Sequence, residues 1–307
     1  MSDKSSWLPT MAGIIKADPG FPSMVAYDRY GQGLTEDRDP QDRGREEGYG
    51  HDVRDAAVDL HQLVGQVCND HPLSGDSMPR LILVANSIGC AIARLFAQEH
   101  LEKVAGIVLL DSVIANSNFE FWPDPDAEGF DANQLPVDIR VEMLREQRAK
   151  FKAIFSPGTK NREGLDRRNL ASLLPHSDQP SLVSPLNRGP FITVVGHDFE
   201  TFAQESLRVS PVVARMKLPV ESTLTVTQSM GLSVSLTMKY ANPPWHEYNE
   251  GLAKLTDVER AKGPIIAPGC GHFIQRDNPG FVVQVVLQMW KDIQKGSISN
   301  WSKATGA

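Results

Sequence analysis

Ser87 has the sequence surroundings of a catalytic nucleophile. It stands between an apolar run, residues 81–85, and a run with helical spacing that begins at Ile88. A serine hydroxyl becomes a useful nucleophile when a tight strand-to-helix turn exposes it to a base and to backbone N–H groups that receive an oxyanion. The small residues Ala85 and Gly89 permit strand and helix to pass closely at such a turn. The pattern predicts a nucleophile elbow with the Ile88 N–H as an oxyanion donor, although an ordinary serine in a strand-to-helix turn has the same local pattern.

His272 is the candidate base for this serine. A serine of ordinary pKa needs a histidine to accept its proton. His272 follows the buried strand-like run 263–267, lies between Gly271 and Phe273, and precedes the last helical pattern. The other seven histidines occupy polar, helix-end or loop positions: His51, His61, His71, His100, His176, His197 and His246.

Two aspartates compete to orient His272. Asp198 follows the strand-like run 191–195 and Asp111 follows the run 104–110. Asp198 is preferred because it gives the chain order Ser, Asp, His, which is one of the known orders for a catalytic Ser-His-Asp triad. Asp111 is the alternative acid. The carboxylate that is not used is expected to cap a strand-to-loop transition.

Strand-like runs alternate with helical patterns along the chain. The predicted strands are residues 23–28, 81–85, 104–110, 191–195 and 263–267, and helical patterns cover 53–67, the stretch after Ser87, and 279–293. Such alternation predicts an α/β fold, a mostly parallel sheet with helices on both faces.

A helical cap is expected between residues 113 and 185. It would interrupt a core made of residues 1–112 and 186–307, and it contains predicted helices at 137–155 and 165–174. Its aromatic residues Phe119, Phe121 and Trp122 are candidate substrate contacts. Ordinary surface helices would give the same pattern. A further segment, 222–237, has almost no charge and fits neither helix nor strand.

The chain resembles the α/β-hydrolase fold superfamily. The resemblance rests on the segments 28–33, 85–89, 110–111, 196–198 and 271–273. It implies a helical cap and makes Gly31 and Gly33 a structural turn rather than a nucleotide site. The family has three strands before the run at 23–28 and a His-Gly oxyanion loop after the third. Only 22 residues precede Ser23, so the chain is expected to begin beyond that loop, and loss of one oxyanion donor slows catalysis by about a hundred- to thousandfold.

Composition narrows the function classes. The 307 residues carry a net charge of −7 and no basic run, which argues against a nucleic-acid surface. No stretch is apolar enough to cross a bilayer, and no signal pattern opens the chain, so a cytoplasmic location is predicted. Cys68, Cys90 and Cys270 have no metal-like spacing and are expected to be reduced. The oligomeric state is not indicated.

These patterns together favour a serine hydrolase. Ser87 would attack a carboxylic ester or lactone of a small to medium apolar molecule, His272 would transfer the proton and Asp198 would orient His272. Neither a metal nor an organic cofactor is required. The same triad could instead hydrolyse a C–C bond, because a fold does not fix the reaction. A third hypothesis is a catalytically silent ligand-binding protein.

Overall fold

A parallel four-stranded sheet organises the described part of the chain. The computed structural model describes residues 4–46, 48–71, 79–118, 120–160, 164–183, 188–207 and 232–305. The strands are β1 (Leu81–Ser87), β2 (Val104–Ser112), β3 (Phe191–Gly196) and β4 (Ala261–Ile266), and they lie side by side in chain order. All three strand pairs are parallel, so their carboxyl ends meet at one edge. The predicted α/β class is confirmed.

The central strand β2 is buried along its whole length. Its side chains alternate between two apolar clusters, as the two-residue period of a strand requires. Ile107 and Leu109 belong to one cluster, whereas Val108 and Leu110 belong to the other. A strand that is covered on both faces explains why residues 104–110 form an unbroken apolar run in the sequence.

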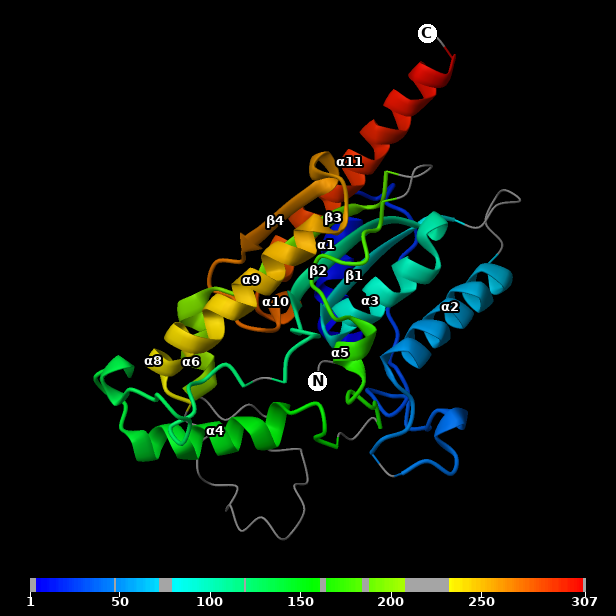
Figure 1. Cartoon of the computed structure of the whole chain (residues 1–307). Helices are drawn as coiled ribbons and strands as arrows, with labels where there is room; N and C mark the ends of the chain where they lie inside the picture. Colours follow the sequence, from blue (N-terminus) through cyan, green and yellow to red (C-terminus); the bar gives the residue numbers. More distant parts are fainter. Residues whose placement is uncertain are drawn as a thin grey trace.

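Helices cover both faces of the sheet (Figure 1). On one face, α2 (Val53–Asp70) packs on α3 (Ile88–Glu99), and α9 (Asn242–Leu252) contacts β3 and β4. On the other, α1 (Leu8–Ala17) packs against α11 (Pro279–Thr305), which contacts β2 and β3. Because helices cover both faces, a site can form at the edge where the carboxyl ends of the strands meet.

The chain between β2 and β3 contains the long helix α4 (Val141–Phe155) and the short α5 (Leu170–Leu173). Figure 1 shows α4 apart from the sheet, beyond the carboxyl ends of its strands. The other α- and π-helices in the described part of the chain are α6 (Phe199–Leu207), α8 (Val234–Leu236), the π-helix η5 (Thr237–Ala241) and α10 (Ile274–Asp277). Short 3-10 helices are η1 (Lys4–Trp7), η2 (Pro40–Asp42), η3 (Leu101–Lys103), η4 (Ala132–Gln134), η6 (Ala253–Leu255) and η7 (Val258–Arg260).

The predicted strand at residues 23–28 is wrong. This segment is irregular, and Val25 within it is exposed. Asp28 accepts hydrogen bonds from the backbone of Lys4 and Leu34 at 2.7 and 3.1 Å, which fixes the end of the segment as a turn. A β-branched and aromatic run becomes a strand only when a neighbour pairs with its backbone, and in the described sheet β1 pairs with β2 alone.

Two other expectations need adjustment. The predicted helix at 165–174 is reduced to α5, and the closing helix is longer than residues 279–293. The unassigned segment 222–237 lies outside the described residues as far as position 231, and its end joins α8 and the π-helix. Among the described helices, none has the length and apolar character that crossing a membrane requires.

Leu109 provides a test of the β2 core. Its side chain is 0% exposed, so Leu109→Ala is expected to lower the free energy of unfolding by about 2 to 5 kcal/mol, through lost burial and an unfilled cavity. Leu34, which is 82% exposed, is the matched control, and Leu34→Ala should change it by less than about 0.5 kcal/mol. Urea unfolding followed by circular dichroism measures both, and equal losses would contradict the placement of Leu109.

Candidate active site

Ser87 occupies a strained turn at the end of β1. Its backbone angles are φ 57° and ψ −126°, and α3 begins at the next residue. A non-glycine residue with positive φ is uncommon and persists where surrounding structure enforces it. A Cβ placed on Gly89 would lie 3.6 Å from the Ala85 Cβ, an ordinary contact distance. Ala85 therefore leaves room for the strand and the helix to pass each other at the turn.

His272 reaches Ser87 from the loop after β4. Its Nε2 lies 2.9 Å from the Ser87 Oγ, within hydrogen-bonding distance. This is the arrangement that a general base requires. The structure brings together the serine and the histidine that the sequence pairs.

Asp111, and not Asp198, hydrogen-bonds to the His272 ring. The Asp111 Oδ2 lies 2.6 Å from the His272 Nδ1, and the Asp111 side chain is 0% exposed. Asp111 also has a positive φ, 42°. The preferred assignment of Asp198 as the orienting acid therefore differs from the structure, whereas the alternative agrees with it. The register explains the outcome: Ser87 pairs with Ser112, so β2 delivers Asp111 beside the elbow, while β3 is one strand farther away.

Asp198 forms hydrogen bonds with the backbone of the loop that precedes His272. Its carboxylate accepts hydrogen bonds from the Thr201 N–H at 3.0 Å, in the first turn of α6, and from the Gly269 N–H at 3.3 Å. Its own N–H donates to the Cys270 carbonyl at 2.8 Å. Asp198 is thus the capping carboxylate, and Gly269, which it holds, stands three residues before the histidine that Asp198 was expected to orient.

Asn86 connects the three segments that carry the triad. Its Nδ2 donates to the Leu110 carbonyl at 2.9 Å and to the His272 carbonyl at 2.8 Å. Both hydrogens of the Asn86 amide are used. They hold β1, the end of β2 that carries Asp111, and the loop that carries His272 in fixed relative positions. The sequence analysis did not single out Asn86. Its signal is a polar amide inside an otherwise apolar strand, directly before the nucleophile.

The charges at the site favour an ionised acid and a protonated thiol. Burial by itself raises the pKa of Asp111, but the charges and hydrogen bonds of His197 and His272 outweigh it and hold the pKa at about 2. Burial raises the pKa of the Cys90 thiol, which donates to the Ala85 carbonyl at 3.4 Å. All three cysteines are free. Cys90 therefore does not compete with Ser87 as a nucleophile.

Aromatic rings from three segments surround His272. The ring centroids of Phe273, Trp245 and Phe202 lie 5.0, 5.7 and 6.5 Å from that of the imidazole. Trp245 is fixed by its Nε1, which donates to the Ser112 carbonyl at 2.8 Å. The approach of Trp245 and Phe202 was not predicted, because it depends on how α6 and α9 pack at the strand ends, whereas Phe273 directly follows His272 in the sequence.

The aromatic residues predicted to contact substrate have different surroundings. Phe119 lies outside the described residues. Trp122 is 4% exposed and packs on Phe151 of α4, with ring centroids 5.4 Å apart, so it stabilises the segment between β2 and β3. Phe121 also contacts Phe151, and it lines a cleft of about 730 Å³ together with Tyr248 of α9.

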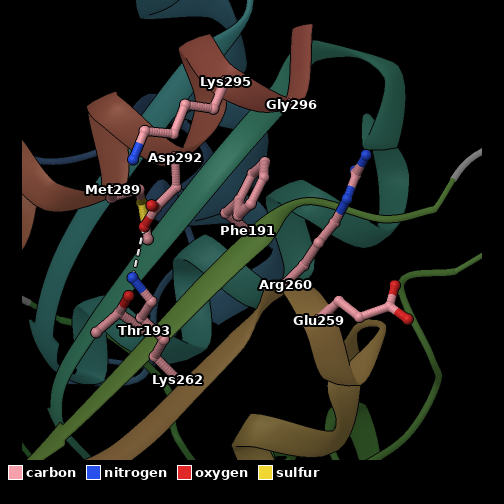
Figure 2. A pocket seen from close by; sticks show the side chains of 9 residues that line it. All are labelled: Phe191, Thr193, Glu259, Arg260, Lys262, Met289, Asp292, Lys295 and Gly296. Atoms are coloured by element: carbon pink, nitrogen blue, oxygen red, sulfur yellow. Dashed lines mark hydrogen bonds and ion pairs between the residues drawn. The ribbon is translucent and has the colours of Figure 1, made fainter. Parts of the chain in front are cut away.

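Another cavity, of about 380 Å³, lies at the opposite end of the sheet. Figure 2 shows it between β3, β4 and α11, with Phe191, Arg260 and Lys295 in its lining. Phe191 opens β3, whereas the triad stands where the strands end. This cavity is separate from Ser87, His272 and Asp111.

One group of described side chains has the chemistry of metal ligands. Potential ligand atoms of Asp39, Asp42 and His51 lie within 4.8 Å of one another, and all three residues belong to the segment 39–51. The His51 Nδ1 is 3.1 Å from the Asp42 Oδ1, so ring and carboxylate pair with each other. The group contains no member of the triad.

The sequence profile of the alpha/beta hydrolase family matches residues 2–285. The chain belongs to this family. No curated protein is similar enough in sequence to count as a match.

Solved structures of this fold include enzymes with different substrates. A thermophilic esterase from Thermogutta terrifontis has 16% sequence identity and a TM-score of 0.50, over 95% of this chain and 86% of that one. A meta-cleavage product hydrolase from Pseudomonas fluorescens IP01 has 14% identity and a TM-score of 0.48, over 95% of this chain and 86% of the other. At such identities the likeness concerns the fold alone.

Replacing each aspartate with asparagine distinguishes their roles. Asp111→Asn removes the negative charge and replaces one of the two acceptor oxygens with an NH₂ donor, so the His272 tautomer is no longer fixed, and modification of Ser87 by a fluorophosphonate probe should slow by about 10⁴-fold. Asp198→Asn keeps an oxygen acceptor for the loop and should slow it by less than about tenfold. Labelling rates measured on gels provide the comparison. A larger loss for Asp198→Asn would contradict the geometry.

Stability in acid tests the buried Asp111 carboxylate. Its pKa of about 2 lies below the ordinary value of 3.8, so the carboxylate stabilises the fold above pH 4 and this contribution disappears as the pH falls towards 2. The parent should therefore lose on the order of 2 kcal/mol more than Asp111→Asn over that range. Urea unfolding at a series of pH values measures the difference, and parallel curves would contradict it.

Proposed function

We propose that this chain is a serine hydrolase that cleaves a carboxylic ester or lactone through an acyl-enzyme. The observation that carries the proposal is the continuous chain of hydrogen bonds from the Ser87 Oγ through the His272 ring to Asp111, at 2.9 and 2.6 Å. Ser87 stands in a strained elbow, where a merely structural serine has no need to be.

The reaction follows from the positions of these atoms. The Ser87 Oγ attacks the carbonyl carbon while the His272 Nε2 accepts the hydroxyl proton, and Asp111 stabilises the imidazolium through Nδ1. The tetrahedral intermediate collapses when His272 returns that proton to the leaving oxygen. A water molecule, deprotonated by His272, then attacks the acyl carbon. The bond to the Ser87 Oγ breaks, the carboxylic acid product leaves, and His272 returns the proton to the Ser87 Oγ.

The amino end of α3 supplies the oxyanion site. Ile88 is the first residue of this 12-residue helix, and the Ser87 side chain makes no capping bond to its N–H groups. The Ile88 N–H is thus available for a developing negative charge, and the dipole of the helix favours the same charge.

Residues 113–185 are proposed to form a cap over this site. Buried Arg94 of α3 joins the end of this segment to the core, since it donates to the His176 and Gln179 carbonyls at 2.8 and 3.2 Å and to the Tyr248 hydroxyl at 2.7 Å. The cleft beside Phe121 and Tyr248 lies between the segment and α9, and its lining is both apolar and polar. A small to medium substrate with an apolar body and a polar tip suits such a lining.

Activity-based labelling tests the proposed function. The folded parent should react with a fluorophosphonate probe, and Ser87→Ala should lose all labelling because the nucleophile is gone. His272→Ala should retain less than about one part in 10³, because the base is removed. Gel fluorescence measures each, with His71→Gln, on an exposed helix-end histidine, as the control that labels normally.

Substrate panels of aryl esters, lactones and C–C cleavable diketones then separate the reaction classes. Turnover of esters or lactones supports the proposal. Labelling without such turnover, but with diketone cleavage, would replace ester hydrolysis with C–C hydrolysis. No labelling of a folded parent would favour a ligand-binding role.

A further inference from the structure

Asp111 is shared by two histidines. Its Oδ2 accepts from His272, and its Oδ1 lies 2.8 Å from the Nδ1 of His197. The His197 backbone N–H also points to Oδ1, at 3.3 Å. His197 is 1% exposed and takes no part in the triad mechanism. Its role calls for a separate explanation.

Both ring nitrogens of His197 face oxygen atoms. Nδ1 faces the Asp111 carboxylate, and Nε2 lies 3.2 Å from the Oδ1 of Asn242. The orientation of the Asn242 amide is set by its other end, because Nδ2 donates to the Phe199 carbonyl at 3.1 Å. Reversing the amide would place two oxygen acceptors against each other. An ionised carboxylate and an amide oxygen accept hydrogen bonds only, so the ring has to donate from both nitrogens.

We propose that His197 is a permanent buried imidazolium that pairs with Asp111 and thereby weakens the field of that carboxylate at His272. It is a positioning residue, since it acts on Ser87 only through Asp111 and His272. The protonation state of His197 is independent of the proposed hydrolysis, whereas its effect on His272 rests on that function.

The surroundings of His197 contain few other charges. The groups that face it are Asp111 at the end of β2, the neighbouring Asp198, and Asn242 at the start of α9. Phe202 of α6 stacks on the ring with centroids 4.1 Å apart, and Trp245 of α9 packs against its edge. Burial lowers the pKa of His197, but the charge and hydrogen bond of Asp111 and the hydrogen bond of Asn242 outweigh it, so the pKa is raised overall.

The consequence for His272 is electrostatic. A lone buried carboxylate would strongly favour the protonated form of a neighbouring imidazole, and a base that is already protonated cannot accept a proton from Ser87. The positive charge of His197 offsets part of that field.

A π-helix, which is a rare type of helix, positions Asn242. It follows directly after the π-helix η5, and its side chain is fully buried. Single π-helical turns occur frequently at functional sites, where they redirect side chains. Here the turn delivers an amide oxygen to the Nε2 of His197.

Nitrogen NMR tests the charge directly. In Ser87→Ala protein labelled with ¹⁵N-histidine, the His197 ring should show both nitrogens protonated at pH 7.5, in a signal that is absent from Ser87→Ala/His197→Gln. Ser87→Ala/Asn242→Leu provides a second assignment, because loss of the Nε2 acceptor should convert this ring to the neutral Nδ1–H form. A neutral His197 in Ser87→Ala would overturn the proposal, whether or not the chain is a hydrolase.

The pH profile tests the effect on His272. In His197→Gln the side-chain amide can still donate to Asp111 but carries no charge. Fluorophosphonate labelling should then be about tenfold slower than the parent at pH 6 and equal to it at pH 8.5. His71→Gln should follow the parent. Superimposed profiles of parent and His197→Gln would overturn the proposed effect, while a parent that does not label at any pH would contradict the proposed function instead.

Discussion

The buried charge of Asp111 is the constraint on which the site depends. A carboxylate without access to water is costly unless hydrogen bonds and opposite charge compensate it. Here two imidazoles approach its two oxygens, at 2.6 and 2.8 Å. One of them meets the nucleophile, and the other is held by Asn242. The positions of the loop after β4 and of α9 are therefore linked to a single carboxylate in β2.

Backbone strain is concentrated at the same place. Ser87 and Asp111 are the non-glycine residues with positive φ in the described chain, and both belong to the proposed triad. Strained conformations of this kind persist where the surrounding structure enforces them. The buried strand β2, the Asn86 amide bonds and the Asp198 carboxylate that holds the loop before His272 provide that enforcement. A rigid frame lets the hydroxyl and the imidazole meet without reorganisation during reaction.

The sequence was sufficient to predict features whose residues lie close together along the chain. The elbow around Ser87 combines a buried strand, small flanking residues and a helical period, all within 15 residues. His272 is recognisable because a glycine-rich loop follows a strand. The parallel sheet follows from the alternation of strand-like runs with helical patterns. Prediction was wrong at residues 23–28, where strand-like residues have no described partner, since pairing is a property of two segments.

The choice between Asp111 and Asp198 was decided by tertiary structure alone. Both residues follow a buried strand, so composition and spacing cannot separate them. What separates them is strand order and register: β2 lies next to β1 with Ser87 opposite Ser112, and β3 lies one strand away. The same holds for His197, Asn242 and Trp245, which reach the site through the packing of α6 and α9 on the strand ends. The sequence by itself determined which chemical groups could react, because reactivity begins with residue type and local turn geometry. Only the folded chain decided which carboxylate they meet, because distances between segments remote in sequence are set by how the sheet and its helices pack.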